Sequence, residues 1–268
     1  MNASAPGNAE RHRPLAARFV EAPHVAAPDK AEQRLGDWLS GLEPAQSAAI
    51  DALLDPPNAK KILLGIAEFS PYLFDLVGAD AGRLIRILSR DPELHLGALI
   101  EETSHAVWSA AGETDVTHLL RRMKAEAALL IALCDIGGVW PVMRVTAALT
   151  DLAVASVQMA LRFLLRQEAA RGRIEPPDPE RPEVGSGLIV LAMGKMGAGE
   201  LNYSSDIDLI VFFDRNATSL VSDIEPQPFF VRVTQAMARL LQQRTGDGYV
   251  FRVDLCLRPD PASTQVAI

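Results

Sequence analysis

The sequence predicts an α+β protein in which a helical region precedes a smaller α/β unit. Apolar residues recur at helical spacing from residue 31 to residue 169, whereas short apolar runs of strand length begin at residue 187. Four prolines between Glu175 and Glu183 separate the two patterns, and proline interrupts both helices and central strands. Helices followed by strands in this order are typical of an α+β fold.

Composition places the chain among soluble globular proteins. It has 268 residues, of which 49% are hydrophobic and 22% are charged, which is enough apolar mass for one or two domains. No run of 18 uncharged apolar residues occurs, so we expect no transmembrane helix and no membrane partner. Residues 1 to 30 lack the apolar segment of a secretory signal, which predicts a disordered leader on a cytoplasmic protein.

The charge balance bears on possible partners. A formal net charge of −8 argues against DNA or RNA as the main partner, because a polymer-binding surface needs positive charge to neutralise phosphates. A mononucleotide stays possible, since a local site and metal ions can hold it. Cys134 and Cys256 lie far apart without metal-type spacing, and we expect them to be reduced thiols.

Helical periodicity and capping residues define the elements of the first region. Asp80 and Asp91 are placed as N-caps, and Gly137 and Gly138 end a long helix. The expected helices cover residues 31 to 42, 58 to 69, 80 to 89, 91 to 110, 115 to 136 and 142 to 168. These patterns predict a helical bundle region over residues 31 to 170.

The second region shows strand patterns around one helix. Apolar runs at 187 to 193 and 207 to 213 predict two buried strands, and alternation at 249 to 257 predicts a third. Between them, 228 to 244 has helical spacing and 245 to 248 reads as a turn. We expect a small mixed sheet at 187 to 268, truncated near its third strand, with residues 171 to 186 as a Pro-rich linker or excursion.

Two aspartates at the start of the second strand form the first candidate site. Side chains alternate along a strand, so Asp206 and Asp208 point to the same face. Their Cα atoms should lie roughly 6–7 Å apart at a rise of ~3.3 Å per residue. Two carboxylates at this spacing can flank a pair of Mg²⁺ ions ~3.5–4 Å apart. Taken alone, an Asp-x-Asp pair is usually a cap or a solvated turn. The prediction of a metal site therefore depends on the order of the elements around it, which is strand, Gly-rich loop, strand, helix and strand.

The segment before these aspartates predicts a phosphate-binding loop. Glycines allow the backbone to approach a phosphate closely, and exposed N–H groups can form an anion nest. A lysine adds positive charge and two serines add hydroxyl donors. The candidate phosphate-binding residues here are Gly194, Lys195, Gly197, Gly199, Ser204 and Ser205.

The third expected strand supplies a further carboxylate. Asp254 has apolar neighbours on both sides, and we expect it to ligate the catalytic metal and to help deprotonate an attacking group. Arg252 shares its strand face by the period of two. Arg252 and Arg258 are candidates for binding phosphate or partner carboxylates.

The motifs at residues 194 to 208 and 249 to 259 resemble the nucleotidyltransferase superfamily typified by DNA polymerase β. Within it, they are most similar to the bacterial family of bifunctional glutamine synthetase adenylyltransferase/adenylyl-removing enzymes. The helical segment at residues 119 to 152 also resembles the region that this family places before its catalytic domain. The resemblance covers roughly residues 30 to 268, with Cys256 standing where the family commonly has an arginine.

The resemblance implies a function and its participants. The family has two nucleotidyltransferase domains in a longer chain, and this copy resembles the amino-terminal one, which removes adenylyl groups by phosphorolysis. It implies an incomplete catalytic core at 187 to 268, with Asp206, Asp208 and Asp254 as ligands of Mg²⁺, two ions being expected, and Gly194 and Lys195 at the phosphates. ATP, ADP and phosphate would be substrates or products. Glutamine synthetase would be the protein substrate, and a PII signalling protein a partner.

Two other interpretations stay open at this point. A uridylyltransferase-like nitrogen sensor of the same superfamily has a similar Gly-rich and Asp-x-Asp motif. Alternatively, the chain is a catalytically silent fragment that binds glutamine synthetase or a PII protein. The sequence does not decide the direction of adenylyl transfer between removal and attachment.

Overall fold

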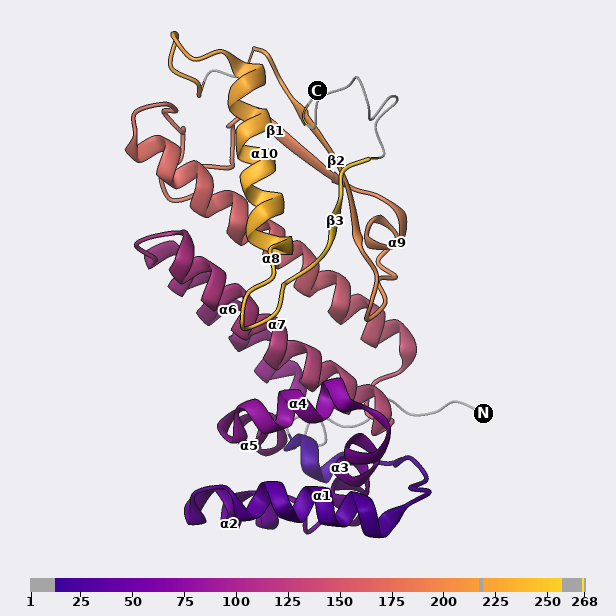
Figure 1. The fold of residues 1–268 in the computed structure, drawn as a ribbon. Helices are drawn as coiled ribbons and strands as arrows, with labels where there is room; N and C mark the ends of the chain where they lie inside the picture. The colour runs from indigo at the N-terminus through magenta and orange to yellow at the C-terminus, as the bar shows by residue number, and fades with distance from the viewer. Residues whose placement is uncertain (1–12, 217–218, 257–266, 268) are drawn as a thin grey trace. The chain divides into compact units, whose positions relative to one another are not determined.

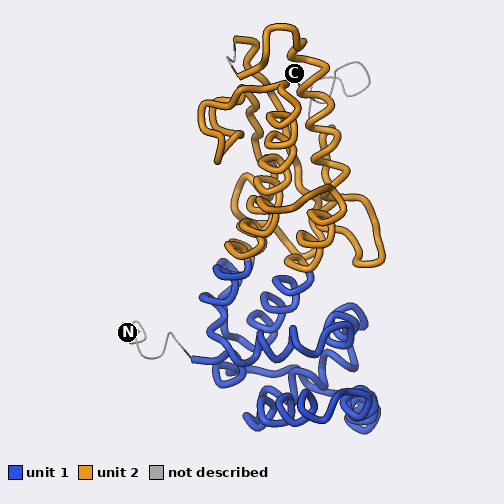
Figure 2. Tube along the Cα trace, turned by 90° about the vertical axis from the view of Figure 1, so that its left-hand side faces the viewer, with its two compact units in different colours: residues 1–99, 125–145 blue, residues 100–124, 146–268 orange. Residues whose placement is uncertain are grey.

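The computed structural model describes residues 13–216, 219–256 and 267 of the chain. The chain divides into two compact units that each combine two stretches of sequence (Figure 2). Unit 1 contains Met1–Leu99 and Ala125–Val145, and unit 2 contains Ile100–Lys124 and Thr146–Ile268. The expectation that residues 187 to 268 form a catalytic core of their own stays a prediction.

Helices make up the whole first region of the chain, as the periodicity predicted (Figure 1). A short 3-10 helix, η2, covers Leu15–Ala17. The α-helices are α1 (Pro28–Ser40), α2 (Pro44–Leu53), α3 (Pro57–Phe69), α4 (Pro71–Ala79), α5 (Ala81–Ser89), α6 (Pro92–Ser109), α7 (Glu113–Ile136) and α8 (Val142–Ala170). All six predicted helices are present.

Helices α2 and α4 were not predicted. Each begins at a proline, which is favourable at the first helical position but is also a signal for a turn. α2 buries only Ile50 and α4 buries only Val77, so neither shows the broad apolar face by which a helix is recognised in sequence.

The predicted helix caps are confirmed. The Oδ1 atom of Asp80 accepts the N–H of Arg83 at 3.0 Å, and Oδ1 of Asp91 accepts the N–H of Leu94 at 3.0 Å. Gly138 follows the end of α7 with φ of +62°, a conformation that favours glycine.

Unit 2 contains a three-stranded mixed sheet, which confirms the predicted α+β class. β1 (Leu188–Ala192) runs antiparallel to β2 (Ile207–Phe213), and β2 runs parallel to β3 (Val253–Asp254). The strand order is β1-β2-β3, so β2 is central. Helix α10 (Pro226–Gln242) lies beside the sheet (Figure 1).

The two faces of the sheet differ in what covers them. Ile207, Leu209 and Val211 on one face of β2 are buried, and Phe213 on the same face stacks on Phe230 of α10 with ring centroids 5.2 Å apart. The opposite face carries Asp208 and remains accessible, with exposed fractions of 47% for Ile189 and 45% for Leu191. The buried face anchors the sheet, and the open face leaves the aspartates reachable.

The third strand is shorter than predicted. A strand was expected over residues 249 to 257, but within the described residues β3 covers only Val253 and Asp254. The N–H groups of Val250 and Phe251 both donate to the carbonyl of Leu241, at 2.9 and 3.1 Å. Their donors are therefore bound to the end of α10 and cannot extend the ladder with β2.

The Pro-rich segment at residues 171 to 186 is packed rather than extended. The N–H of Glu175 donates to the carbonyl of Ser219 at 2.6 Å, and Nε of Arg162 on α8 donates to Glu183 at 3.0 Å. Ser186 is 1% exposed. These contacts fit an excursion that packs within unit 2.

Among the described residues, one single helix, α8, is long and apolar enough to cross a membrane by length and composition. In the most apolar stretch of α8, 72% is buried within the protein. That burial is the pattern of a core helix.

Candidate active site

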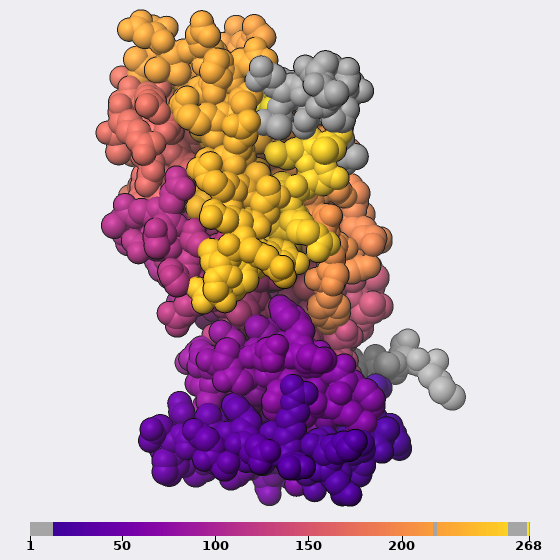
Figure 3. Space-filling model, viewed as in Figure 1, coloured from indigo at the N-terminus to yellow at the C-terminus, as the bar shows by residue number. Residues whose placement is uncertain are grey.

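A cavity of about 610 Å³ lies where β2 begins. Of the eight described residues that line it, seven are candidates that the sequence predicted. The lining consists of Gly194, Lys195, Asn202, Ser204, Ser205, Asp206, Asp208 and Arg252. Asn202 was not singled out, although it stands within the quoted motif between the glycines and the aspartates. In the space-filling view, the segment that leads into β3 forms surface beside the α9–β2 region (Figure 3).

The strands bring the predicted carboxylates to one face of the sheet. Asp206 immediately precedes β2, and Asp208 is its second residue. Asp208 is the register partner of Asp254 on the parallel strand β3, so the two side chains project to the same face. Asp254 does not line the cavity, and its Oδ1 atom accepts the N–H of Cys256 at 2.6 Å.

Arg252 connects β3 to the aspartate pair. Its Nε atom donates to Oδ1 of Asp206 at 2.5 Å, and Nη2 donates to the same carboxylate and to the carbonyl of Ser204, the latter at 2.9 Å. The hydrogen bond that Arg252 donates to Asp206 raises the pKa of the Arg252 guanidinium. Arg252 also lies within 3.4 Å of the Tyr249 hydroxyl oxygen. A cationic group therefore stands at the mouth of the candidate metal site.

The glycine segment forms a helical turn rather than an open loop. Gly194–Gly197 makes the short helix α9, which was not predicted. The N–H groups of Gly197 and Ala198 donate to the carbonyls of Met193 and Gly194, at 2.9 and 3.1 Å. Those of Gly199 and Glu200 also donate within the turn. The anion nest predicted from residues 194 to 199 is thus reduced, because these donors are already bound.

The three glycines serve different structural needs. Gly194 has φ of +52°, and a Cβ there would lie 2.4 Å from Oδ2 of Asp208. A Cβ at Gly197 would lie 2.4 Å from the carbonyl oxygen of Ala192, which indicates close packing of two backbones. Gly199 has φ of +75° with open space around it. Among the three, only Gly194 lines the cavity.

A hydrogen bond to α8 holds the loop between α9 and β2 in place. The N–H of Leu201, which is 0% exposed, donates to Oγ1 of Thr150 on α8 at 3.2 Å. Thr150 is itself buried and donates to the carbonyl of Thr146 at 2.9 Å. This bond holds the residues that follow, Asn202 to Ser205, at the rim of the cavity.

The oxygen atoms of this cavity fit the needs of a divalent metal. Asp206 and Asp208 offer hard oxygen atoms in one cavity, which fits Mg²⁺ held by two carboxylates and completed by substrate phosphates and water. Among the residues that the structure describes, no three His, Cys, Asp or Glu side chains are gathered into a ready-made metal cluster. The fit therefore rests on the pair, and metal ligation by Asp254 stays a prediction.

Residues 61–268 match the protein family described as Glutamate-ammonia ligase adenylyltransferase. The chain belongs to this family. It is 73% identical over its whole length to the bifunctional glutamine synthetase adenylyltransferase/adenylyl-removing enzyme of Bradyrhizobium diazoefficiens, covering 27% of that protein. It is 70% identical to the relative of the same description from Bradyrhizobium sp. (strain ORS 278), again over its whole length and 27% of the relative.

More distant members agree with this assignment. The enzyme of the same description from Xanthobacter autotrophicus is 51% identical over 98% of the chain and 26% of its own length. The chain thus spans about a quarter of the length of these adenylyltransferase family members. The family resemblance inferred from the motifs at 194 to 208 and 249 to 259 is confirmed. Arg258 of the second motif lies outside the described residues, so its predicted phosphate contact stays a prediction.

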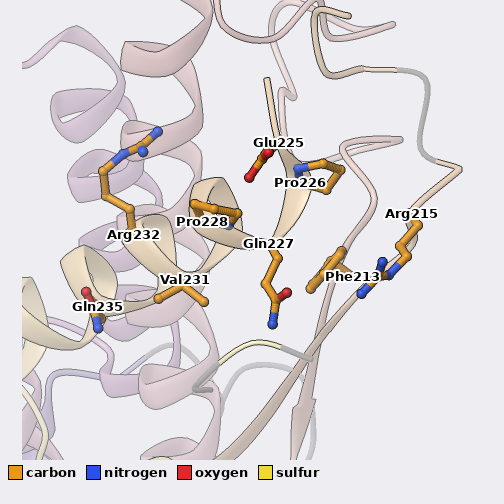
Figure 4. A pocket seen from close by; sticks show the side chains of 9 residues that line it. All are labelled: Phe213, Arg215, Glu225, Pro226, Gln227, Pro228, Val231, Arg232 and Gln235. Atoms are coloured by element: carbon orange, nitrogen blue, oxygen red, sulfur yellow. The ribbon is translucent and has the colours of Figure 1, made fainter. Parts of the chain in front are cut away.

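A second cavity, of about 630 Å³, lies near the other end of β2 and the start of α10 (Figure 4). None of the predicted site residues that the structure describes lines it. Its lining is Phe213, Arg215, Glu225, Pro226, Gln227, Pro228, Val231, Arg232 and Gln235. Arg215 and Arg232 lie on opposite sides of it in the close-up, and Arg232 pairs with the buried Glu168 at 3.2 Å. The two arginines therefore do not converge on a common anion.

Proposed function

We propose that this chain carries a metal-dependent nucleotidyl-transfer site that removes adenylyl groups from a tyrosine of glutamine synthetase. The observation that carries the proposal is the shared cavity of Asp206 and Asp208 with Lys195 and Arg252. Paired carboxylates next to cationic side chains suit a reaction in which phosphate groups meet a divalent ion. The names of its relatives support glutamine synthetase as the substrate and adenylyl transfer in both directions, and removal is proposed here because this copy resembles the amino-terminal domain of the family.

The proposed reaction is a phosphorolysis. An oxygen of inorganic phosphate attacks the phosphorus of the adenylyl-tyrosine, the bond from phosphorus to the tyrosine oxygen breaks, and the products are ADP and tyrosine after protonation of its oxygen. The attacking phosphate is already an anion, so positioning and charge stabilisation matter more than a strong base. Running the transfer from ATP instead would attach the adenylyl group and release pyrophosphate.

The residues of the cavity would have different roles in this reaction. Asp206 and Asp208 would hold Mg²⁺, which supplies positive charge for the phosphate oxygens when bound. Lys195 and Arg252 would neutralise the remaining phosphate charge, and Arg252 can leave the Asp206 carboxylate because both side chains are about half exposed. Ser204 and Ser205 would donate hydrogen bonds to phosphate oxygens. Asp254 would complete the ligand set by turning away from the Cys256 N–H.

The open face of the sheet suits a macromolecular substrate. A tyrosine on another protein has to approach the carboxylates from that face, beside the exposed Ile189 and Leu191. A PII signalling protein is a further proposed partner, in line with regulation of nitrogen assimilation. The reaction would take place in the cytoplasm, where glutamine synthetase and its nucleotides are found.

The deciding experiment is an assay for phosphate-dependent release of ADP from adenylylated glutamine synthetase, with Mg²⁺ and the purified chain. We expect release by the parent chain and a loss of at least a hundredfold in Asp206→Asn, because that change removes a metal-binding charge. Unchanged release in Asp206→Asn would refute the metal assignment. Absence of release by the parent chain, with intact binding of glutamine synthetase, would support the silent fragment instead.

A further inference from the structure

A buried arginine of α7 binds the segment that connects the end of α10 to β3. Arg121 is 1% exposed. Its Nε atom donates to the carbonyl of Gly248 at 2.9 Å, and Nη1 donates to the carbonyls of Thr117 and Leu240 at 3.0 and 3.3 Å. Nη2 donates to the carbonyl of Gln243. A single planar guanidinium thus joins α7 to the end of α10 and to the turn that follows it.

The partners of Arg121 explain why it can be buried. Within the described residues no carboxylate pairs with its guanidinium, and burial lowers its pKa, whereas nearby Asp247 acts in the opposite direction. A buried charge is tolerated where hydrogen bonds satisfy it. The last carbonyls of a helix lack donors within the helix and carry the negative end of its dipole. The end of α10 therefore offers the environment that this cation requires.

A second contact from the same helix holds the next part of the segment. The ammonium group of Lys124, three residues after Arg121, lies 4.0 Å from the ring centroid of Phe251. Phe251 is 4% exposed, and its N–H donates to the carbonyl of Leu241 at 3.1 Å. The chain from residue 240 to residue 251 is therefore held by α7 at both of its ends.

This segment leads directly into the candidate active site. Arg252 follows Phe251, and its carbonyl accepts the N–H of Ile207 at 2.9 Å. Within the described part of the chain, two residue pairs join β3 to β2, the second being Asp208 with Asp254. So few backbone pairs do little to fix the register of β3 against β2. The contacts of the preceding segment therefore help to set the position of the strand.

We propose that Arg121 is a positioning residue for the candidate active site. By fixing the turn at residues 243 to 249, it sets where Arg252 and Asp254 lie against β2. The helical stretch that contains Arg121 thereby acts as a support for the third strand. The kinetic consequence rests on the proposed function, whereas the structural consequence does not.

Amide hydrogen exchange tests the structural part on the purified chain. Arg121→Met removes the donors while keeping an unbranched apolar side chain of similar length. We expect amides in residues 243 to 256 to exchange at least tenfold faster, with those of β1 unchanged. Arg122→Met, on the exposed neighbour, is the matched control and should leave exchange as in the parent. Acceleration spread evenly over unit 2, or no acceleration, would overturn the proposal.

A second variant keeps the test decisive if Arg121→Met does not fold. Arg121→Lys retains the charge but cannot reach all the carbonyls, so exchange at 243 to 256 should lie between the parent and the methionine variant. In the phosphorolysis assay we expect kcat to fall at least tenfold, with KM for adenylylated glutamine synthetase changed less than threefold. Localised faster exchange with an unchanged kcat would refute the positioning role. An inactive parent chain would refute the proposed function and leave the positioning proposal standing. The hydrogen-exchange data alone would then decide whether Arg121 fixes the segment before β3.

Discussion

A Cβ atom at Gly194 would lie 2.4 Å from Oδ2 of Asp208. Real Cβ atoms do not approach so closely, so a side chain here must move the carboxylate or the backbone. The left-handed conformation of Gly194 adds about 1–2 kcal/mol for any residue with a Cβ. The absence of a side chain at position 194 is therefore a condition for the observed position of Asp208.

Gly194→Ala should strongly reduce phosphorolysis. A shift of about 1 Å in a catalytic group can cost on the order of a hundredfold in rate, and we expect a loss of this size. Gly199→Ala is the control, because Gly199 also has positive φ but open space around it. Initial rates of ADP release and the thermal midpoint of both variants should be compared. Equal activity in the two variants would contradict the steric argument.

The strand that follows Asp206 and contains Asp208 could be predicted from the sequence. The apolar run from Ile207 to Phe213 is a strand with the predicted bounds, because a short run of apolar residues is a local feature of the sequence. Asp206 and Asp208 follow from the strand period of two. The glycine-rich segment was located correctly too, but its helical turn was missed, since a four-residue helix has too few positions to show periodicity.

Features that depend on contacts distant in sequence were not predictable. The third strand is short because Val250 and Phe251 donate to α10, and no local pattern reports that. The burial of Arg121 was equally hidden, because three of its four acceptors are backbone carbonyls more than a hundred residues away. Asn202 lines the cavity, but an asparagine in a polar loop carries no signal that separates it from an ordinary turn residue.

Thr150→Val should loosen the loop between α9 and β2. Valine matches the shape of threonine but cannot accept the N–H of Leu201, which is fully buried. An unpaired buried N–H costs about 1–3 kcal/mol, so the free energy of unfolding should fall by this amount. Chemical denaturation measures it, and amide exchange over residues 198 to 206 should increase. Thr150→Ser keeps the hydroxyl, and a serine variant as unstable as the valine variant would contradict the role of this bond.

Arg252→Gln should increase the affinity of the cavity for divalent ions. Arg252 binds the Asp206 carboxylate and so competes with a cation for it. Because both side chains are about half exposed and screened by water, the pair is weak, and we expect only about a two- to fivefold tighter binding of the ion. Titration with Mn²⁺ followed by electron paramagnetic resonance measures this change.

The same variant should also show whether Arg252 contacts phosphate. If it does, KM for phosphate rises in Arg252→Gln even though the metal binds more tightly. Arg239→Gln is a suitable control, since Arg239 on α10 is equally exposed and pairs with Glu113, which lies outside the cavity lining. Unchanged Mn²⁺ affinity in Arg252→Gln would show that the Asp206 pair does not compete with metal.

Glu126 in unit 1 is a buried carboxylate whose charge depends on two partners. Burial alone would raise its pKa, but hydrogen bonds from His95 at 2.8 Å and Arg86 at 2.6 Å lower it to about 2. The folded state therefore releases the proton more readily than the unfolded state, where the ordinary value is 4.5. The unfolded chain binds more protons between these two values, so stability falls as pH falls through this window.

The Glu126 carboxylate should accordingly stabilise the protein fully above about pH 4.5 and progressively less toward pH 2. Since one pKa unit corresponds to about 1.4 kcal/mol, the loss amounts to at most about 3 kcal/mol. Glu126→Gln does not titrate, so the difference in unfolding free energy between parent and variant should be constant from pH 5 to 7 and shrink below pH 4.5. Urea denaturation at a series of pH values measures this difference. Glu43→Gln, at an exposed position in unit 1, should show no such dependence, and a constant difference for Glu126→Gln down to pH 2 would refute the assigned charge pairing.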